Sequence, residues 1–123
     1  MQNPQEVYLR NQVNTARPED LTLMLYNGAI KFLNQAKMAI EKKDIPKANS
    51  SLVKTQDIIT ELMTTLNMDY EISKSLVSLY DYMKNRLIEA NIAKDVAAIV
   101  EIESMLLELR NTWAMAMKQG KSS

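Results

Sequence analysis

Histidine and cysteine are both absent from the 123-residue sequence. Without cysteine no disulfide can form, and without either residue the chain has no thiol nucleophile and no Cys/His metal site. A di-iron site of the kind found in four-helix bundles needs Glu-x-x-His pairs, so it is excluded too. The lack of cysteine fits a reducing compartment. We therefore expect no catalytic residue, no metal and no cofactor.

Glycine and proline are scarce, with 2 and 3 residues respectively. Few turns are then available, which favours a few long elements over many short strands. The hydrophobic fraction of 46% and the charged fraction of 24% are typical of a globular protein. The length fits one domain with a single core.

An excess of charge of either sign is also missing, because 15 basic side chains balance 15 acidic ones. A nucleic-acid binder normally has a basic excess, since phosphate contacts supply most of its affinity. No apolar run approaches the roughly 18 residues of a membrane span, and residues 1–6 do not resemble a signal peptide. We expect a cytoplasmic protein with neither nucleic acid nor a membrane as its partner.

Helical periodicity, with apolar residues three and four apart, marks four segments: about 18–42, 45–66, 70–90 and 96–118. Their starts carry residues that favour helix N-termini: Pro18, Asp44, Asp69 and Asp95. Short connections between long helices force antiparallel neighbours. We predict an all-α fold, an antiparallel up-down four-helix bundle over 18–119, with an N-terminal arm at 1–17 and a frayed tail at 120–123.

One apolar stripe per helix is assigned to the core. In the second helix it is Ala48, Leu52, Thr55, Ile59, Leu62 and Leu66. In the third it is Ile72, Leu76, Leu79, Met83, Leu87 and Ala90, and in the fourth Ile99, Ile102, Leu106, Leu109, Trp113 and Ala116. In the first helix we take Leu25 as inward-facing.

A second apolar stripe remains on each helix when residues are placed at 100° intervals. It comprises Leu23 and Ile30, then Val53 and Ile58, then Tyr70, Val77 and Ile88, then Val96, Val100, Leu107 and Ala114. A simple bundle needs only one buried stripe per helix, so the second predicts apolar grooves outside it. Such patches mark interfaces, and a helical or extended partner can place apolar anchors in them. The nine methionines suit adaptable binding surfaces.

Other interpretations of the second stripe stay open. Scattered exposed valine and leucine are normal, the arm can cover one groove, and a weak homodimer can bury another. The last case would make the chain a self-associating structural protein. Two carboxylate pairs share helix faces, Asp57 with Glu61 and Glu101 with Glu108. We interpret them as solvated charges rather than as an acid–base pair or a cation site.

Several segments carry a family resemblance: VNTARPEDLTLMLYNGAIKF at 13–32, DIITEL at 57–62, LYDYM at 79–83, LIEAN at 87–91 and LRNTW at 109–113. With these segments the sequence resembles the FliS family of flagellin export chaperones, over nearly the whole chain and in one register. The resemblance implies a cytoplasmic antiparallel bundle that binds the C-terminal segment of flagellin. Binding prevents premature polymerisation, and the chaperone presents the subunit to the flagellar export apparatus.

The resemblance also implicates the arm, because Tyr8 matches a tyrosine of the family's partner site. In some members the arm occupies the binding groove when no partner is present. The partner-binding set that we predict therefore joins Tyr8 and Val13 of the arm to the second stripe, without Tyr70 and Ala114.

Overall fold

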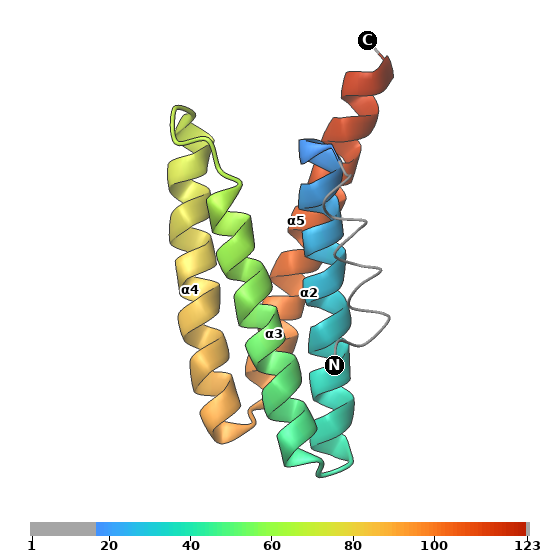
Figure 1. Cartoon of the computed structure of the whole chain (residues 1–123), viewed down its shortest axis with the longest axis vertical. Coiled ribbons are helices and arrows are strands. Elements are labelled where there is room, and N and C mark those ends of the chain that lie inside the picture. Colours follow the sequence, from blue (N-terminus) through green and yellow to red (C-terminus); the bar gives the residue numbers. More distant parts are fainter. Residues whose placement is uncertain (1–16, 123) are drawn as a thin grey trace, which may run out of the picture.

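Four helices make up the part of the chain that the structure, a computed structural model, describes: residues 17–122, with side chains to residue 119. They are α2 (Pro18–Glu41), α3 (Ile45–Thr64), α4 (Glu71–Ala93) and α5 (Val96–Ser122), and these residues form no strand (Figure 1). The predicted all-α, four-helix fold is confirmed. The arm residues Tyr8 and Val13 lie outside the described residues.

The helix starts follow from local hydrogen bonding. Pro18 occupies the first position of α2, where its missing N–H costs nothing. The Asp44 side chain accepts a hydrogen bond from the backbone N–H of Lys47 at 3.2 Å, and Asp95 accepts one from Ala97 at 3.0 Å. These bonds satisfy N–H groups that the helix itself leaves free. The predicted caps at Asp44 and Asp95 are confirmed.

The start of α4 differs from the prediction. Its N-cap is Tyr70, which makes no side-chain capping bond, so the expected cap at Asp69 is wrong. The reason lies in the turn before the helix, where the backbone N–H of Asp69 bonds to the side-chain oxygen of Asn67 at 3.0 Å. That local turn delays the first helical residue to Glu71.

Two lysines in the left-handed region end helices: Lys43 with φ 60° after α2, and Lys94 with φ 51° after α4. Two helix ends differ from those expected. The helix α4 continues past Ala90 to Ala93, and α3 stops at Thr64, before Leu66. The helix α5 continues past Lys118 to Ser122, and Gly120 does not end it.

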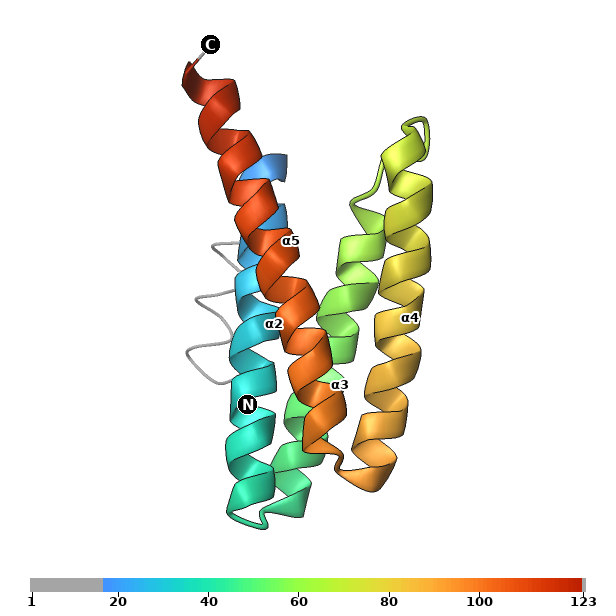
Figure 2. The ribbon, with the colours of Figure 1, turned by 180° about the vertical axis from the view of Figure 1, so that it is seen from behind.

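Each helix contacts the next along the chain, and α5 returns to α2, which closes an antiparallel ring. The α2–α3 contact is the most extensive of the four and the α4–α5 contact the smallest. Seen from front and back, α4 and α5 lie closest near their connection and then diverge, and the far end of α5 extends beyond its neighbours (Figures 1 and 2). The bundle is thus tight on one side and open at one end.

All four helices contribute to one buried core. The stripes predicted for α3 and α5 are largely confirmed, since Ala48, Leu52, Thr55, Ile59, Leu62, Ile99, Ile102 and Leu106 are fully buried. In α4 the C-terminal half of the predicted stripe is confirmed, because Met83, Leu87 and Ala90 are buried. Leu66, Leu76, Leu79, Leu109 and Trp113 are half-buried against this core.

Three side chains lie elsewhere than predicted. Ile72 is 65% exposed because it lies in the first turn of α4, where Ser73 takes the inward position. Ala116 is exposed because it lies about one turn beyond Trp113, which already contacts the first turn of α2. Ile30 is only 8% exposed, so its placement on the outer face is wrong. The buried stripe of α2 follows helical spacing through Tyr26, Ala29, Ile30, Leu33 and Ala36, and the half-buried Leu25 from which the outer face was counted is not its centre.

A buried polar pair crosses the bundle. The hydroxyl oxygens of Tyr26 in α2 and Tyr80 in α4 lie 2.5 Å apart and share a hydrogen bond. Burial raises the pKa of both phenols, and for Tyr80 the bond to Tyr26 raises the pKa further. Within the described residues, no buried side-chain nitrogen or oxygen lacks a hydrogen-bond partner. The periodicity did not identify Tyr80 as a core residue.

Candidate partner-binding surface

Three hydrogen bonds join α2 to α5 along their length: Lys37 Nζ to Glu103 at 2.8 Å, Arg110 Nη1 to Asn27 at 3.4 Å, and Trp113 Nε1 to the Glu19 carbonyl at 2.9 Å. Bonds between facing helices identify the sides that meet. Residues three or four positions from a bonded residue therefore lie on the same side.

Predicted partner-binding residues gather along this line. In α5, Leu107 lies four residues after Glu103, and Val100 lies three residues before it. Val96 lies one further turn away. In α2, Leu23 lies four residues before Asn27, and Ile30 lies three residues after it. We call these five residues, Leu23, Ile30, Val96, Val100 and Leu107, the α2/α5 seam.

A cavity of about 660 Å³ lies at the Val96 end of the α2/α5 seam. Five residues of α2 and one of α5 line it: Asn34, Lys37, Met38, Ile40, Glu41 and Val96. Val96 and Val100 are 40% and 43% exposed, whereas Leu23 and Leu107 are half-buried. Ile30 is buried in the core, so it does not make the exposed contact that was predicted.

Other predicted residues lie on a second line, between α3 and α4. The side-chain amides of Asn49 and Asn91 bond at 2.7 Å and identify the facing sides. Val53 lies one turn after Asn49, and Ile88 lies three residues before Asn91. Val77 lies about three turns before Ile88 on the same side. Val53 and Ile88 are exposed and Val77 is half-buried. We call Val53, Val77 and Ile88 the α3/α4 seam.

Ile58 lies apart from both seams. A Cβ placed on Gly28 of α2 would stand 3.4 Å from the terminal carbon of Ile58, so Ile58 belongs to the α2–α3 contact. The structure therefore divides the nine described members of the predicted set among three places, and five of them lie on the α2/α5 seam.

The α4/α5 edge is polar by contrast. Tyr82 donates to Glu101 at 2.6 Å, and the Arg86 guanidinium lies 3.4 Å from the same carboxylate. The bond to Glu101 raises the pKa of Tyr82, and the bond from Arg86 to Glu89 raises the pKa of that guanidinium. Sequence reasoning missed this group, because spacing within one helix does not show which charges face each other across two.

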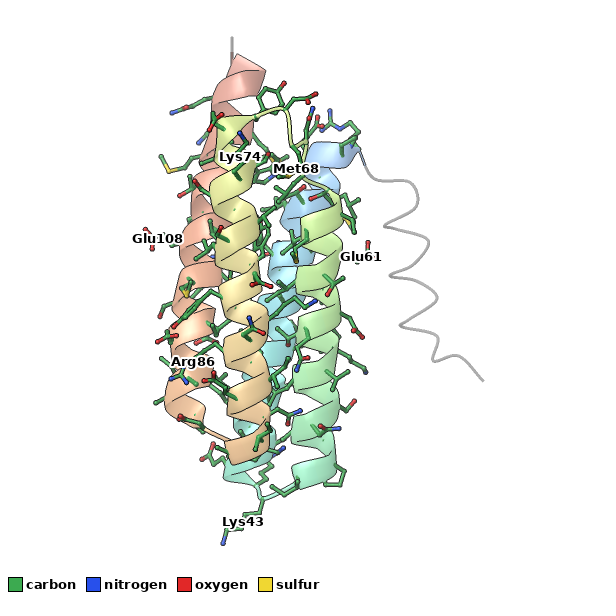
Figure 3. All side chains as sticks on the ribbon, turned by 90° about the vertical axis from the view of Figure 1, so that its left-hand side faces the viewer. Lys43, Glu61, Met68, Lys74, Arg86 and Glu108 are labelled. Carbon is green, nitrogen blue, oxygen red and sulfur yellow. The ribbon has the colours of Figure 1, made fainter. Side chains whose placement is uncertain are left out.

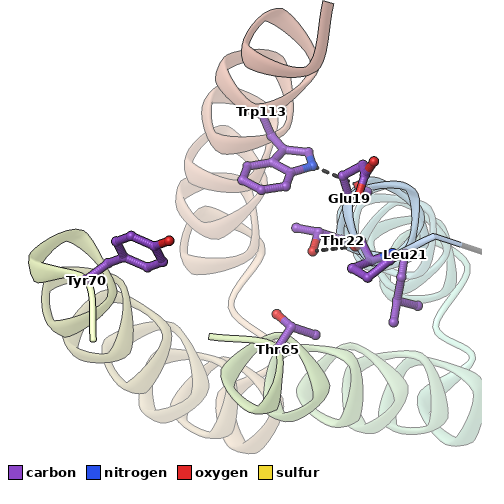
Figure 4. A pocket seen from close by; sticks show the side chains of 7 residues that line it. Glu19, Leu21, Thr22, Thr65, Tyr70 and Trp113 are labelled. Carbon is purple, nitrogen blue, oxygen red and sulfur yellow. Dashed lines mark hydrogen bonds between the residues drawn. The ribbon is translucent and has the colours of Figure 1, made fainter. Parts of the chain in front are cut away.

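A second cavity, of about 730 Å³, lies at the open end of the bundle. Figure 4 shows Tyr70 and Trp113 on two sides of it, with Thr22 across from Tyr70 and Thr65 across from Trp113. It is lined by Pro18, Glu19, Leu21, Thr22, Thr65, Tyr70 and Trp113. Sequence reasoning missed this site as well, since its residues come from four different helix ends.

The carboxylates do not converge. Glu61 and Glu108 point away from the bundle on opposite sides (Figure 3). Within residues 17–122, no group of three or more carboxylates could hold a metal ion. No helix in this part of the chain is long and apolar enough to cross a membrane.

The comparison with known families decides the identity. The model of the family described as "Flagellar protein FliS" matches residues 1–120. The chain belongs to the FliS family. A curated relative, the flagellar secretion chaperone FliS of Bacillus subtilis, is 46% identical over 118 residues, which cover 96% of this chain and 89% of the relative.

Other FliS relatives agree. FliSB of Pseudomonas aeruginosa is 34% identical over 92% of this chain and 91% of its own length. FliS of Vibrio cholerae is 32% identical over 92% and 85%. Both are named flagellar secretion chaperones. The resemblance to the FliS family that the sequence predicted is confirmed.

Proposed function

We propose that this FliS-family chain is a cytoplasmic, non-enzymatic chaperone that binds the C-terminal segment of flagellin. It prevents premature polymerisation and aids delivery to the flagellar export apparatus. The observation that carries the proposal is the α2/α5 seam, where apolar side chains follow one another beside polar bonds between the helices. Membership in a family of flagellar secretion chaperones supports it.

The seam has the chemistry that an amphipathic helix needs. Val96, Val100 and Leu107 offer apolar contacts at helical spacing, and the Lys37–Glu103 pair offers charges beside them. A partner segment that orders itself on binding loses conformational entropy, so its affinity per unit area is modest. Modest affinity suits a subunit that must later be released for export.

Calorimetric titration of the chain with flagellin tests the proposal. Full-length flagellin should bind, and flagellin that lacks its C-terminal segment should not. If the truncated flagellin binds as tightly as the full-length protein, the proposal is wrong.

Two surface variants then locate the site. Val100→Asp on the α2/α5 seam and Ile88→Asp on the α3/α4 seam should each weaken flagellin binding about tenfold or more, because a carboxylate would face apolar anchors. Helicity should stay intact, since both side chains are more than 40% exposed. Ile92→Asp is the matched control, because Ile92 is 83% exposed and belongs to neither seam. If Val100→Asp unfolds the chain, or binds as the control does, the seam is not the site.

Self-association is the competing proposal, motivated by Val53 and Ile88, which are exposed together on the α3/α4 seam. Sedimentation velocity over a range of concentrations separates the two. A stable oligomer that flagellin does not dissociate would favour the structural role over the chaperone role.

A further inference from the structure

The cavity at the open end of the bundle shares no lining residue with the cavity beside Val96. We call it the aromatic cavity and define it by Pro18, Leu21, Thr22, Thr65, Tyr70 and Trp113. We propose that the aromatic cavity is a second docking site, which takes an arginine or lysine side chain flanked by apolar residues from a partner protein. The proposal goes beyond flagellin binding and does not depend on it.

Three side chains of the aromatic cavity already donate hydrogen bonds to backbone carbonyls, while the Tyr70 hydroxyl points into the space. The indole N–H of Trp113 donates to the Glu19 carbonyl at 2.9 Å. The Thr22 hydroxyl donates to the Pro18 carbonyl at 3.3 Å, and the Thr65 hydroxyl to the Leu62 carbonyl at 2.7 Å. What these three side chains offer to an occupant is therefore carbon surface and aromatic ring rather than donors for an anion.

Two aromatic rings, from different helices, line this space. Tyr70 is the N-cap of α4 and is 63% exposed, and Trp113 belongs to the half of α5 that diverges from α4 (Figures 2 and 4). Aromatic faces attract cations, and tryptophan does so most strongly. An aliphatic stem also packs on such rings while its charged end stays near water.

The charges around the aromatic cavity favour the same occupant. Carboxylates outnumber cations within four positions of the lining residues: Glu19, Asp20, Glu61, Asp69 and Glu71 against Arg17, Lys74 and Arg110. Two of the cations already form salt bridges. Arg17 pairs with Asp20 at 2.9 Å and lies 3.9 Å from Glu19, and Lys74 pairs with Glu71 at 3.1 Å. Glu19 itself lines the cavity. A basic side chain would meet both the rings and an excess of carboxylates.

The single tryptophan of the chain makes this site observable, because Trp113 alone accounts for the tryptophan emission. The probe is a blocked tetrapeptide, acetyl-Leu-Arg-Leu-Leu-amide, titrated into the full chain. Its control carries citrulline in place of arginine, which keeps the shape and removes the charge. The arginine peptide should change the emission saturably, and the citrulline peptide should bind about fivefold more weakly, as the loss of a cation–π contact predicts.

Variants of the chain localise the effect. Glu19→Gln and Tyr70→Ala should each weaken the arginine peptide about threefold to fivefold, and added salt should weaken it in the unmodified chain. Asp57→Asn and Tyr82→Ala are the matched controls, an exposed carboxylate and an exposed tyrosine away from the cavity, and should leave the affinity unchanged.

Four results would overturn the proposal. The first is emission that does not respond saturably to the arginine peptide, and the second is equal affinity for the citrulline peptide. The third is a shift of the free chain's emission in Arg10→Gln, which would make the chain's own N-terminal segment the occupant. The fourth is emission that changes with protein concentration alone, which would make a second copy the occupant.

Discussion

The hydroxyl oxygens of Tyr26 and Tyr80 lie 2.5 Å apart in the interior and link α2 to α4 across the bundle. These helices are opposite one another in the ring rather than neighbours. Each phenol satisfies the other, so the pair is tolerated among apolar side chains. The bond also favours one register of α2 against α4, because apolar contacts alone are not directional.

A double-mutant cycle measures this pairing. Tyr26→Phe or Tyr80→Phe alone leaves one buried hydroxyl unsatisfied and should lower the free energy of unfolding by about 1–3 kcal/mol. The double variant removes both hydroxyls and should cost less than the sum of the single losses. Urea denaturation of the four proteins gives the coupling energy. Strict additivity would show that the two hydroxyls do not depend on one another.

The same pair predicts a loss of stability in alkali. Burial raises the pKa of both phenols in the folded state above the unfolded value of about 10. Above that pH the unfolded chain releases protons that the folded chain retains, so the free energy of unfolding falls as pH rises. Below about pH 9 this contribution should be constant. Urea titrations from pH 8 to 11 should show a shallower fall in the double Tyr26→Phe, Tyr80→Phe variant, and equal slopes would contradict the argument.

Gly28 offers a test of the α2–α3 contact. An alanine there would place its Cβ 3.4 Å from the terminal carbon of Ile58, an ordinary contact. Alanine is better than glycine inside a helix by about 0.8–1 kcal/mol. Gly28→Ala should therefore raise the free energy of unfolding by about 0.5–1 kcal/mol in thermal or urea denaturation. Gly28→Val, with two further methyl groups toward Ile58, should lower it. A destabilised alanine variant would mean that the two helices cannot yield at this position.

The indole N–H of Trp113 in α5 donates a hydrogen bond to the Glu19 carbonyl and so links α5 to the first turn of α2. Trp113→Phe removes the donor, and we expect a loss of about 0.5–1.5 kcal/mol. The loss should be local, with faster amide hydrogen exchange at Leu21 and Thr22 and little change at buried Leu33. Tyr82→Phe, which removes the bond to Glu101, is the control and should leave the first turn of α2 unchanged. Uniformly faster exchange would instead place Trp113 among the residues that hold the whole core.

The sequence predicted the core best where the inward stripe was counted from the correct residue. In α3 and α5 it was, and Leu52, Ile59, Ile99 and Ile102 are fully buried as expected. It failed for Ile30 because the wheel of α2 was centred on Leu25, which lies half-buried beside the true stripe. The Asp44 and Asp95 caps were predictable because a cap depends on residues only two or three positions away.

The candidate site was predictable only in part, because a wheel drawn for one helix does not contain its neighbours. Helical spacing showed that Val96, Val100 and Leu107 share a side of α5. It did not show that Leu23 lies along the same seam, because that depends on how α2 and α5 pair. The aromatic cavity was not predictable at all, since Tyr70 and Trp113 line one cavity only because of how the ends of α4 and α5 are placed in the bundle.

The unequal contacts between the helices have a mechanical consequence. The α2–α3 contact is the most extensive and the α4–α5 contact the smallest, so we expect the bundle to be stiffer along the α2–α3 edge than along the opposite one. A load that separates the helices should open the α4–α5 edge first, with the short connection at Lys94 and Asp95 as the pivot. Such hinged compliance would let the far half of α5 yield to pulling while the α2–α3 pair keeps its shape.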